Sequence, residues 1–251
     1  METRLEYRNK RFPQRVVNKM DKILLFHGCT NRFVTSQISE ATNKILKEAN
    51  VDFQSLKREL CCGFILYENG QHDAAIEVMK KNQEMFSSYD IDTILTSCPT
   101  CAYIFKVHYP EYLPEWNYKV VHMSEFLAKL IEEKKIDIKE KPEVTVTYHD
   151  PCHLLRGLGI TDEPRKVLKA IPGLKLEEMK HSRDTSKCCG AGSGMRLSFS
   201  SVAQALAQNR ISEAEETGAT VLVTACPTCM LHLKENAKNI EVIDISEAII
   251  D

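Results

Sequence analysis

Ten cysteines in two series of the same form constrain this 251-residue chain more than any other feature. Each series has a single cysteine, then an adjacent Cys-Cys pair followed by glycine, then a Cys-Pro-Thr-Cys motif. The gaps between these parts are 31 and 35 residues in the first series and 35 and 36 in the second. The first series is Cys29, Cys61, Cys62, Cys98 and Cys101, and the second is Cys152, Cys188, Cys189, Cys226 and Cys229. No cysteine is left over, which indicates that each set of five acts as a unit.

The repeat extends beyond the cysteines. A short apolar run of β-forming residues ends just before the first cysteine of each series, and another leads into each Cys-Pro-Thr-Cys motif. A third pair of runs ends at the start of a helix. The pairs are Lys22–His27 with Glu143–His149, Asp92–Ser97 with Ala219–Ala225, and Tyr118–Phe126 with Ile240–Ala248. Corresponding positions lie 122 to 128 residues apart, so the chain consists of two similar halves.

Helical patterns lie between the expected strands. Apolar residues recur at spacings of three and four in one stripe: Val34, Ile38, Ala41, Ile45 and Ala49. The alternation of strands and helices predicts an α/β fold with two pseudo-symmetric halves, each a small, mostly parallel sheet with flanking helices. The cysteines then lie at the C-terminal ends of strands, where open α/β sheets form their binding sites.

The predicted organisation has four parts. An N-terminal arm comprises residues 1–21, and the first cysteine-rich domain comprises residues 22–133. A charged linker at residues 134–141 leads into the second cysteine-rich domain, residues 142–251.

Composition and charge exclude several classes of protein. With 43% hydrophobic and 27% charged residues, the chain has the composition of an ordinary globular protein. A net charge of -2 gives no electrostatic basis for binding nucleic acid. No apolar stretch approaches the ~20 residues that span a bilayer, and Met1–Met20 has no apolar core for a secretory signal. We therefore expect a cytoplasmic protein without a transmembrane segment, in which cysteines serve as metal ligands or redox groups rather than in disulfides.

The cysteine spacing favours a multinuclear metal centre. Cys-X-X-Cys brings two thiolates to one metal, whereas adjacent thiolates diverge and suit different metal atoms of one cluster. Glycine after each pair removes a side chain where the backbone approaches the bound group. Five thiolates exceed the four of a structural zinc site and the four of a conventional iron–sulfur cluster. An iron–sulfur cluster of atypical geometry is therefore favoured over the alternatives of structural zinc, which leaves one cysteine of five unused, or buried free thiols.

These motifs, repeated over almost the whole chain from Asp21, resemble the CCG cysteine-rich domain of heterodisulfide reductases. The resemblance is to the B subunit of these enzymes and to the C-terminal part of their D subunit. It implies two noncubane [4Fe-4S] clusters, one on each set of five cysteines. It also implies an oxidoreductase of methanogenesis, in which the disulfide of coenzyme M and coenzyme B is reduced between the two clusters, at the junction of the halves.

The resemblance also implies partner subunits. No C-x-x-C-x-x-C-x-x-x-C-P run occurs, so ferredoxin-type clusters are expected on a separate iron–sulfur subunit, together with a flavoprotein subunit. An alternative function is a non-catalytic electron-transfer subunit of a flavin-dependent dehydrogenase or quinone-linked reductase, of the lactate, glycolate, glycerol-3-phosphate or succinate/fumarate type. Two intact cysteine sets favour the catalytic function.

Two histidines flank Cys152 in the sequence Tyr-His-Asp-Pro-Cys-His. His149 and His153 are candidate catalytic residues, because reduction of a disulfide consumes two protons. The alternative is that both only form hydrogen bonds with backbone at the end of a strand.

Overall fold

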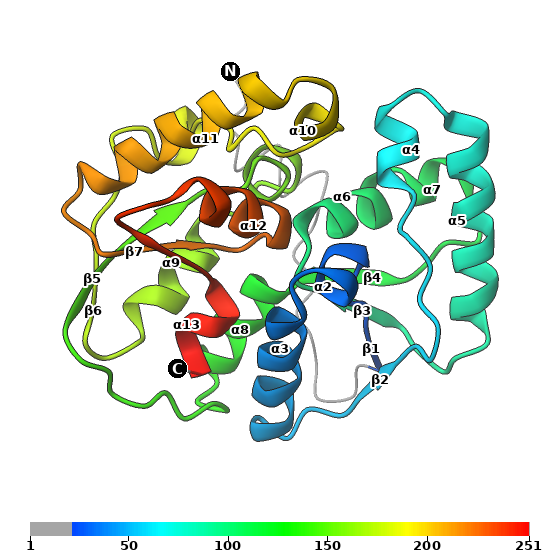
Figure 1. Ribbon diagram of the computed structural model, residues 1–251. Coiled ribbons are helices and arrows are strands. Elements are labelled where there is room, and N and C mark those ends of the chain that lie inside the picture. The colour runs from blue at the N-terminus through cyan, green and yellow to red at the C-terminus, as the bar shows by residue number, and fades with distance from the viewer. Residues whose placement is uncertain (1–21, 251) are drawn as a thin grey trace, which may run out of the picture.

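The computed structural model describes residues 22–250, which form two four-stranded parallel sheets flanked by helices (Figure 1). The first sheet has the order β2-β1-β3-β4, and the second has the corresponding order β6-β5-β7-β8. The strands of the first sheet are β1 (Ile23–Leu25), β2 (Phe53–Ser55), β3 (Thr93–Thr96) and β4 (Lys119–His122). Those of the second are β5 (Val144–His149), β6 (Leu174–Leu176), β7 (Val221–Thr224) and β8 (Glu241–Asp244). The predicted α/β architecture of two similar halves is confirmed.

Helices connect consecutive strands, as parallel pairing requires. The first half contains α2 (Cys29–Phe33), α3 (Ser36–Glu48), α4 (Phe64–Glu68), α5 (His72–Ser87), α6 (Pro99–Val107), α7 (Tyr109–Tyr112) and α8 (Met123–Glu132). The second half contains the π-helix η1 (His153–Gly157), α9 (Asp162–Lys169), the 3₁₀ helix η2 (Arg183–Thr185), α10 (Met195–Ser198), α11 (Ser200–Glu215), α12 (Pro227–Asn236) and α13 (Ile245–Ile250).

The predicted apolar stripe forms the buried face of α3, with one exception. Ile38, Ala41 and Ile45 are buried on this helix. Val34 is 58% exposed and lies before the helix, because the chain turns at Thr35, whose hydroxyl donates to Asn31 Oδ1 at 2.9 Å.

The last helix of each half begins with a reciprocal cap. His122 Nδ1 accepts from the backbone N–H of Ser124, while Glu125 accepts from the backbone N–H of His122. In the second half, Asp244 accepts from the N–H of Ser246 and Glu247 accepts from that of Asp244. These capping boxes fix the helix starts that the sequence predicts at the end of each repeat.

A hydrophobic core joins the two halves, because its buried side chains come from both sheets, among them Leu24 and Tyr148. A second, smaller cluster lies mainly in the second half and contains Cys189, Cys226 and Cys229. The packing between the halves is reciprocal: α8 packs against α9, and α13 packs against α3. Each half therefore closes its core with the terminal helix of the other.

The predicted linker, residues 134–141, lies between α8 and β5 and contains neither helix nor strand. Its Ile136 and Ile138 are half-buried against the shared core. The division into two domains stays a prediction, and the predicted arm, residues 1–21, lies outside the described residues. Among residues 22–250, no helix combines the length and apolarity that crossing a membrane requires.

A buried ion pair fixes the segment that leads into Cys152. Arg165 donates to both carboxylate oxygens of Asp150, at 2.7 and 2.9 Å, and both side chains are at most 3% exposed. Arg165 also donates to both oxygens of Glu178, at 2.6 and 2.8 Å. Asp150 Oδ2 additionally accepts from the backbone N–H of Arg183. This network ties β5, α9 and the segment after β6 together.

We expect Arg165→Leu to lower the free energy of unfolding by about 3–5 kcal/mol, because it leaves the Asp150 carboxylate buried without its partner. Urea unfolding followed by circular dichroism measures the loss. Lys166→Ala is the matched control: it removes an exposed pair with Glu132, at a cost of about 0–1 kcal/mol. Equal losses in the two variants would contradict the importance of the Asp150 pair.

Candidate metal centres

Strand order brings the two outer parts of each cysteine series together. Cys29 opens α2 after β1, and Cys98 caps α6 after the neighbouring strand β3, with Cys101 in the first turn of that helix. In the second half, Cys152 follows β5 and Cys226 caps α12 after the neighbouring strand β7. Because the carboxyl ends of parallel strands meet at one edge of a sheet, these cysteines converge at that edge.

The first set forms one connected group of thiols. The Cys61 thiol raises the pKa of its neighbour Cys29, and Cys61 is followed directly by Cys62. The Cys101 thiol lowers the pKa of both Cys62 and Cys98, so these three are neighbours as well. The adjacent pair thus bridges the cysteine after β1 and the two cysteines after β3.

The second set repeats this arrangement. The Cys188 thiol raises the pKa of its neighbour Cys152, and Cys188 is followed directly by Cys189. The Sγ atoms of Cys189 and Cys229 are 3.3 Å apart, and Cys226 Sγ accepts from the backbone N–H of Cys229 at 3.4 Å. All ten predicted ligands therefore lie in two groups of five, as their spacing predicts; their role as metal ligands stays a prediction.

The thiols of each group share protons rather than ionising together. The hydrogen bond from Cys101 lowers the pKa of Cys62 to about 6, whereas the contact with Cys62 raises the pKa of Cys101. In the second set, the contact with Cys188 raises the pKa of Cys152, and the reciprocal contact lowers the pKa of Cys188. A group of five thiolates therefore needs added positive charge, which bound metal supplies.

Each group is closed at its back and open on one side. The three cysteines nearest the helix starts and core are buried in each set: Cys62, Cys98 and Cys101, and Cys189, Cys226 and Cys229. The remaining two are accessible: Cys29 is exposed, and Cys61, Cys152 and Cys188 are half-buried. This arrangement holds a bound group firmly and leaves one edge open to a substrate or a redox partner.

Close backbone packing shapes both centres. Gly28 has φ +81°, and a Cβ there would lie 3.2 Å from Cys101 Sγ. Gly190 has φ +85°, and a Cβ there would lie 2.7 Å from the carbonyl oxygen of Ala203 in α11. The glycine after the Cys188-Cys189 pair thus lets the loop approach a helix, in addition to the predicted approach to a bound group.

Two arginines that sequence reasoning missed hold the loops before the Cys-Cys pairs. Arg32 Nη1 donates to the carbonyl oxygen of Glu59 at 3.1 Å, and Arg156 Nη2 donates to the carbonyl oxygen of Ser186. Arg32 follows Cys29 by three residues, and Arg156 follows Cys152 by four. An arginine at nearly the same place in both halves was therefore visible in the repeated sequence.

The two centres face each other across the junction of the halves. The helix after the first cysteine of each half packs on the Cys-Pro-Thr-Cys helix of the other: η1 on α6, and α2 on α12. Figure 1 shows α2 and α6 beside α12 in the middle of the molecule.

His153 lies at this junction. Its Nδ1 is 3.4 Å from Thr100 Oγ1 and 3.7 Å from Cys152 Sγ. Its ring packs on Phe64 and Tyr103, with centroids 4.8 and 5.3 Å away. Burial lowers the pKa of His153. The structure thus brings this predicted catalytic residue between a cysteine of one set and the Cys-Pro-Thr-Cys motif of the other.

His149 lies behind the second set rather than at the junction. It is 1% exposed, and one of its ring nitrogens lies within 4.8 Å of Sγ of both Cys189 and Cys229. Burial, with the positive charge of Arg210, lowers the pKa of His149 to about 3. Proton transfer by either histidine stays a prediction.

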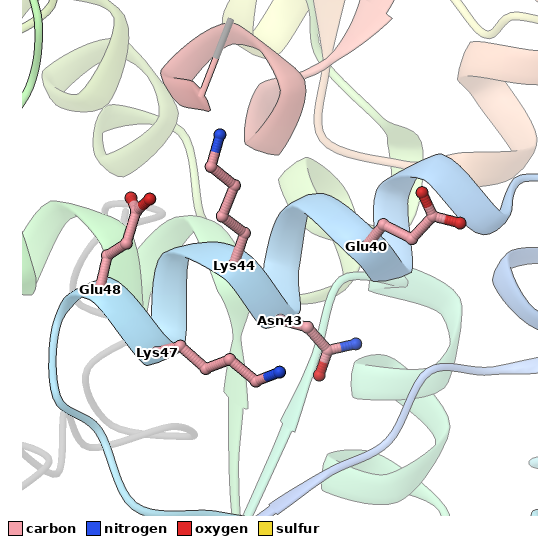
Figure 2. Close-up of a pocket in the computed structure, with 5 residues that line it drawn as sticks. All are labelled: Glu40, Asn43, Lys44, Lys47 and Glu48. Atoms are coloured by element: carbon pink, nitrogen blue, oxygen red, sulfur yellow. The ribbon is translucent and has the colours of Figure 1, made fainter.

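A separate surface pocket has no metal-binding character. Figure 2 shows five charged or amide side chains around it, all on the polar face of α3: Glu40, Asn43, Lys44, Lys47 and Glu48. It contains neither cysteine nor histidine and carries both signs of charge, so it offers no alternative centre.

Fold and site together define a duplicated α/β protein with one cysteine-rich centre in each half. Residues 23–106 and 146–234 match the CCG cysteine-rich domain, so the chain belongs to the CCG family. The resemblance inferred from the motifs is thereby confirmed.

Two relatives show how similar the sequence is to subunits of reductases. The chain is 36% identical to the D subunit of the dihydromethanophenazine:CoB–CoM heterodisulfide reductase of Methanosarcina acetivorans, over 91% of this chain and 57% of that protein. It is 34% identical to the B subunit of the fumarate reductase (CoM/CoB) of Methanothermobacter marburgensis, over 92% of this chain and 46% of that protein. The chain thus spans about half the length of these relatives.

A hypothetical protein from Helicobacter pylori has the same fold at 10% identity. The TM-score is 0.66, and the match covers 98% of this chain and 53% of that one.

We expect Gly190→Ala to lower metal content by about half, because strain at φ +85° and the contact with Ala203 displace the Cys188-Cys189 pair of one centre only. Gly192→Ala is the matched control, since a Cβ there meets nothing within 4 Å. Metal and acid-labile sulfide per chain are measured in both variants after anaerobic purification. Full metal content in Gly190→Ala would contradict this account of the loop.

Proposed function

We propose that the chain is an iron–sulfur subunit of an oxidoreductase complex and that each set of five cysteines binds one noncubane [4Fe-4S] cluster. The observation that carries this proposal is the gathering of five neighbouring thiols in each half. The ligands are Cys29, Cys61, Cys62, Cys98 and Cys101 in the first centre, and Cys152, Cys188, Cys189, Cys226 and Cys229 in the second.

The residues present fit such a group. Both donor sets consist entirely of thiols, the ligands that iron–sulfur clusters take. A tetrahedral zinc ion uses four ligands and leaves one thiol of each group without a role. His149 Nε2, buried beside the second set, has no hydrogen-bond partner among the described residues, and a cluster sulfur supplies one.

We further propose that the complex reduces a small-molecule disulfide of the coenzyme M–coenzyme B type at the junction of the halves. The support is 36% identity to a heterodisulfide reductase subunit and the packing that turns both centres toward one another. Cleaving the S–S bond takes two electrons and two protons and yields two thiols. The clusters supply the electrons one at a time.

The protein's own residues orient the substrate and deliver the protons. The rings of Phe64 and Tyr103 provide apolar walls around His153. Thr100 holds the imidazole at Nδ1, next to Cys152. In this position His153 can donate a proton to the thiolate released at the junction.

Partner subunits are part of the proposal. The relatives are subunits by name, which supports partner subunits for this chain. We propose that these are a ferredoxin-like iron–sulfur subunit and a flavoprotein subunit. Large apolar side chains are exposed on α10 and α2 and suit contact with another subunit: Leu197 is 91% exposed and Phe33 78%. We place the complex in the cytoplasm.

A second candidate function is a non-catalytic electron relay for a flavin-dependent dehydrogenase or quinone-linked reductase. Identity of 34% to a fumarate reductase subunit favours it. Both clusters then pass electrons between partners, and no disulfide is bound.

Reduced viologen should drive reduction of the coenzyme M–coenzyme B disulfide by the complex purified without oxygen. Iron, acid-labile sulfide and the co-purifying subunits are determined on the same sample. Zinc without sulfide would contradict the clusters. Intact clusters with a flavin dehydrogenase partner and no disulfide reduction would favour the relay.

His153→Phe should lower the rate of disulfide reduction by about 10²–10⁴-fold, since it keeps the ring packing and removes the proton donor. Steady-state assay with reduced viologen measures the rate, and iron content should not change. His108→Phe is the matched control: its ring also packs on Tyr103, at 5.3 Å, but its Nδ1 pairs with Glu111. Unchanged turnover, or parallel loss of iron and turnover, would show that His153 is only structural.

A further inference from the structure

A buried polar chain lies behind the second cysteine set. Arg210, on α11, is fully buried, and its Nε donates to His149 Nδ1 at 3.0 Å. Its Nη1 donates to Glu213 Oε2 at 2.7 Å and to the carbonyl oxygen of His181 at 2.8 Å. Glu213 in turn pairs with Lys187 and His181 near the surface. These contacts hold the guanidinium of Arg210 in one position against His149.

This chain fixes the tautomer of His149. A guanidinium only donates hydrogen bonds, so Nδ1 of His149 must accept and the proton must lie on Nε2. Nε2–H has no hydrogen-bond partner among residues 22–250. Buried donors are rarely left unpaired. The imidazole lies beside the thiols of Cys189 and Cys229, with a ring nitrogen within 4.8 Å of both Sγ atoms.

The corresponding position of the first half, within residues 22–250, holds no such donor. In the first sheet Leu25 pairs with Leu95, and at the corresponding place in the second sheet Tyr148 pairs with Val223. Phe26 follows Leu25 and His149 follows Tyr148, so Phe26 is the counterpart of His149. Phe26 packs edge-on against other aromatic rings in the core.

The position of Arg210 also differs between the halves. Gly63 lies against Ala75 of α5, and Gly190 lies against Ala203 of α11. Asn82 follows Ala75 by seven residues, and Arg210 follows Ala203 by seven, so Asn82 is the counterpart of Arg210. Asn82 donates to the carbonyl oxygen of Cys61 and to the hydroxyl of Tyr109 instead.

A carboxylate lies beside the first centre. The Glu59 carboxylate accepts from the backbone N–H groups of His27 and Gly28, at 2.9 and 2.6 Å, directly before Cys29. Arg32, which donates to the carbonyl oxygen of Glu59, is the cation nearest to it among these contacts and is exposed. The second centre thus has a buried guanidinium and an N–H donor beside it, whereas the first centre has a carboxylate.

We propose that His149, positioned by Arg210, donates Nε2–H to a sulfur of the second cluster and makes that cluster easier to reduce than the first. The inference rests on the proposed binding of clusters, but not on the identity of the substrate. A hydrogen bond to sulfur stabilises the more negative, reduced form of a cluster and so raises its reduction potential. The two similar halves then hold clusters of unequal potential, and an electron that reaches the first is passed to the second.

Redox titration of the two clusters, followed by electron paramagnetic resonance on the anaerobically purified complex, tests the inference. His149→Phe introduces the residue that the first half has at this position. In this variant the higher reduction potential should fall by at least about 59 mV, which corresponds to a tenfold change in the equilibrium of a one-electron reduction. His149→Gln keeps an N–H donor and should retain most of the potential. The lower potential should not change in either variant.

Glu59→Gln is the reciprocal variant. Removing its negative charge should raise the lower potential and leave the higher one unchanged. Unchanged potentials in His149→Phe, or equal shifts with phenylalanine and glutamine, would overturn the role of His149.

A spectroscopic test detects the nitrogen directly. With ¹⁵N-labelled histidine, pulsed electron paramagnetic resonance should detect a weakly coupled nitrogen at the higher-potential cluster in His153→Phe, the variant that removes the other histidine near this centre, whose Nδ1 lies 3.7 Å from Cys152 Sγ. Absence of this coupling, or the strong coupling of a nitrogen bound to iron, would overturn the inference.

The outcomes separate this inference from the proposed function. If the wild-type complex contains no iron or sulfide, both fail. If two clusters titrate without disulfide reduction, the disulfide reductase proposal fails while the potentials still decide the role of His149. If disulfide reduction is normal and the potentials do not respond to His149→Phe, only this inference fails.

Discussion

Thiolates repel one another, and holding five of them in contact is the constraint on which both halves of this protein depend. The fold meets it by placing the cysteines at the ends of parallel strands, where helices begin. Cys98 and Cys226 cap α6 and α12, so their sulfurs lie at helix N-termini, where unpaired backbone N–H groups favour negative charge. The contact between Cys152 and Cys188 raises the pKa of the first thiol and lowers the pKa of the second, so one of the two holds its proton more tightly. In each set three cysteines are buried in the protein and two are accessible from outside. Each centre is therefore both anchored in the core and open to solvent.

Duplication turns two such centres into one site. Each half packs its first short helix on the Cys-Pro-Thr-Cys helix of the other, so these helices meet at a common junction. His153 spans that junction, between Cys152 and Thr100. The halves have the same strand order, yet their polar surroundings differ, with Glu59 beside one centre and Arg210 behind the other. Symmetry of the backbone thus coexists with asymmetry of charge.

The sequence predicts the scaffold well because its signals are local or repeated. The paired apolar runs give the strands, and the Ser-Glu pairs at Ser124 and Ser246 mark the helix starts. The grouping of the cysteines follows from their positions at strand ends. The contact between Arg210 and His149 joins residues 61 positions apart, and no spacing rule reports it. Arg32 and Arg156 were recoverable from the repeat, but their role depends on loop paths that only the folded chain reveals.

The shared core also sets how the molecule responds to damage. Since α13 completes the core against α3, and α8 against α9, neither sheet is covered by its own helices alone. Cutting the chain at residues 134–141 would therefore expose apolar surface on both fragments, rather than release two independently folded halves.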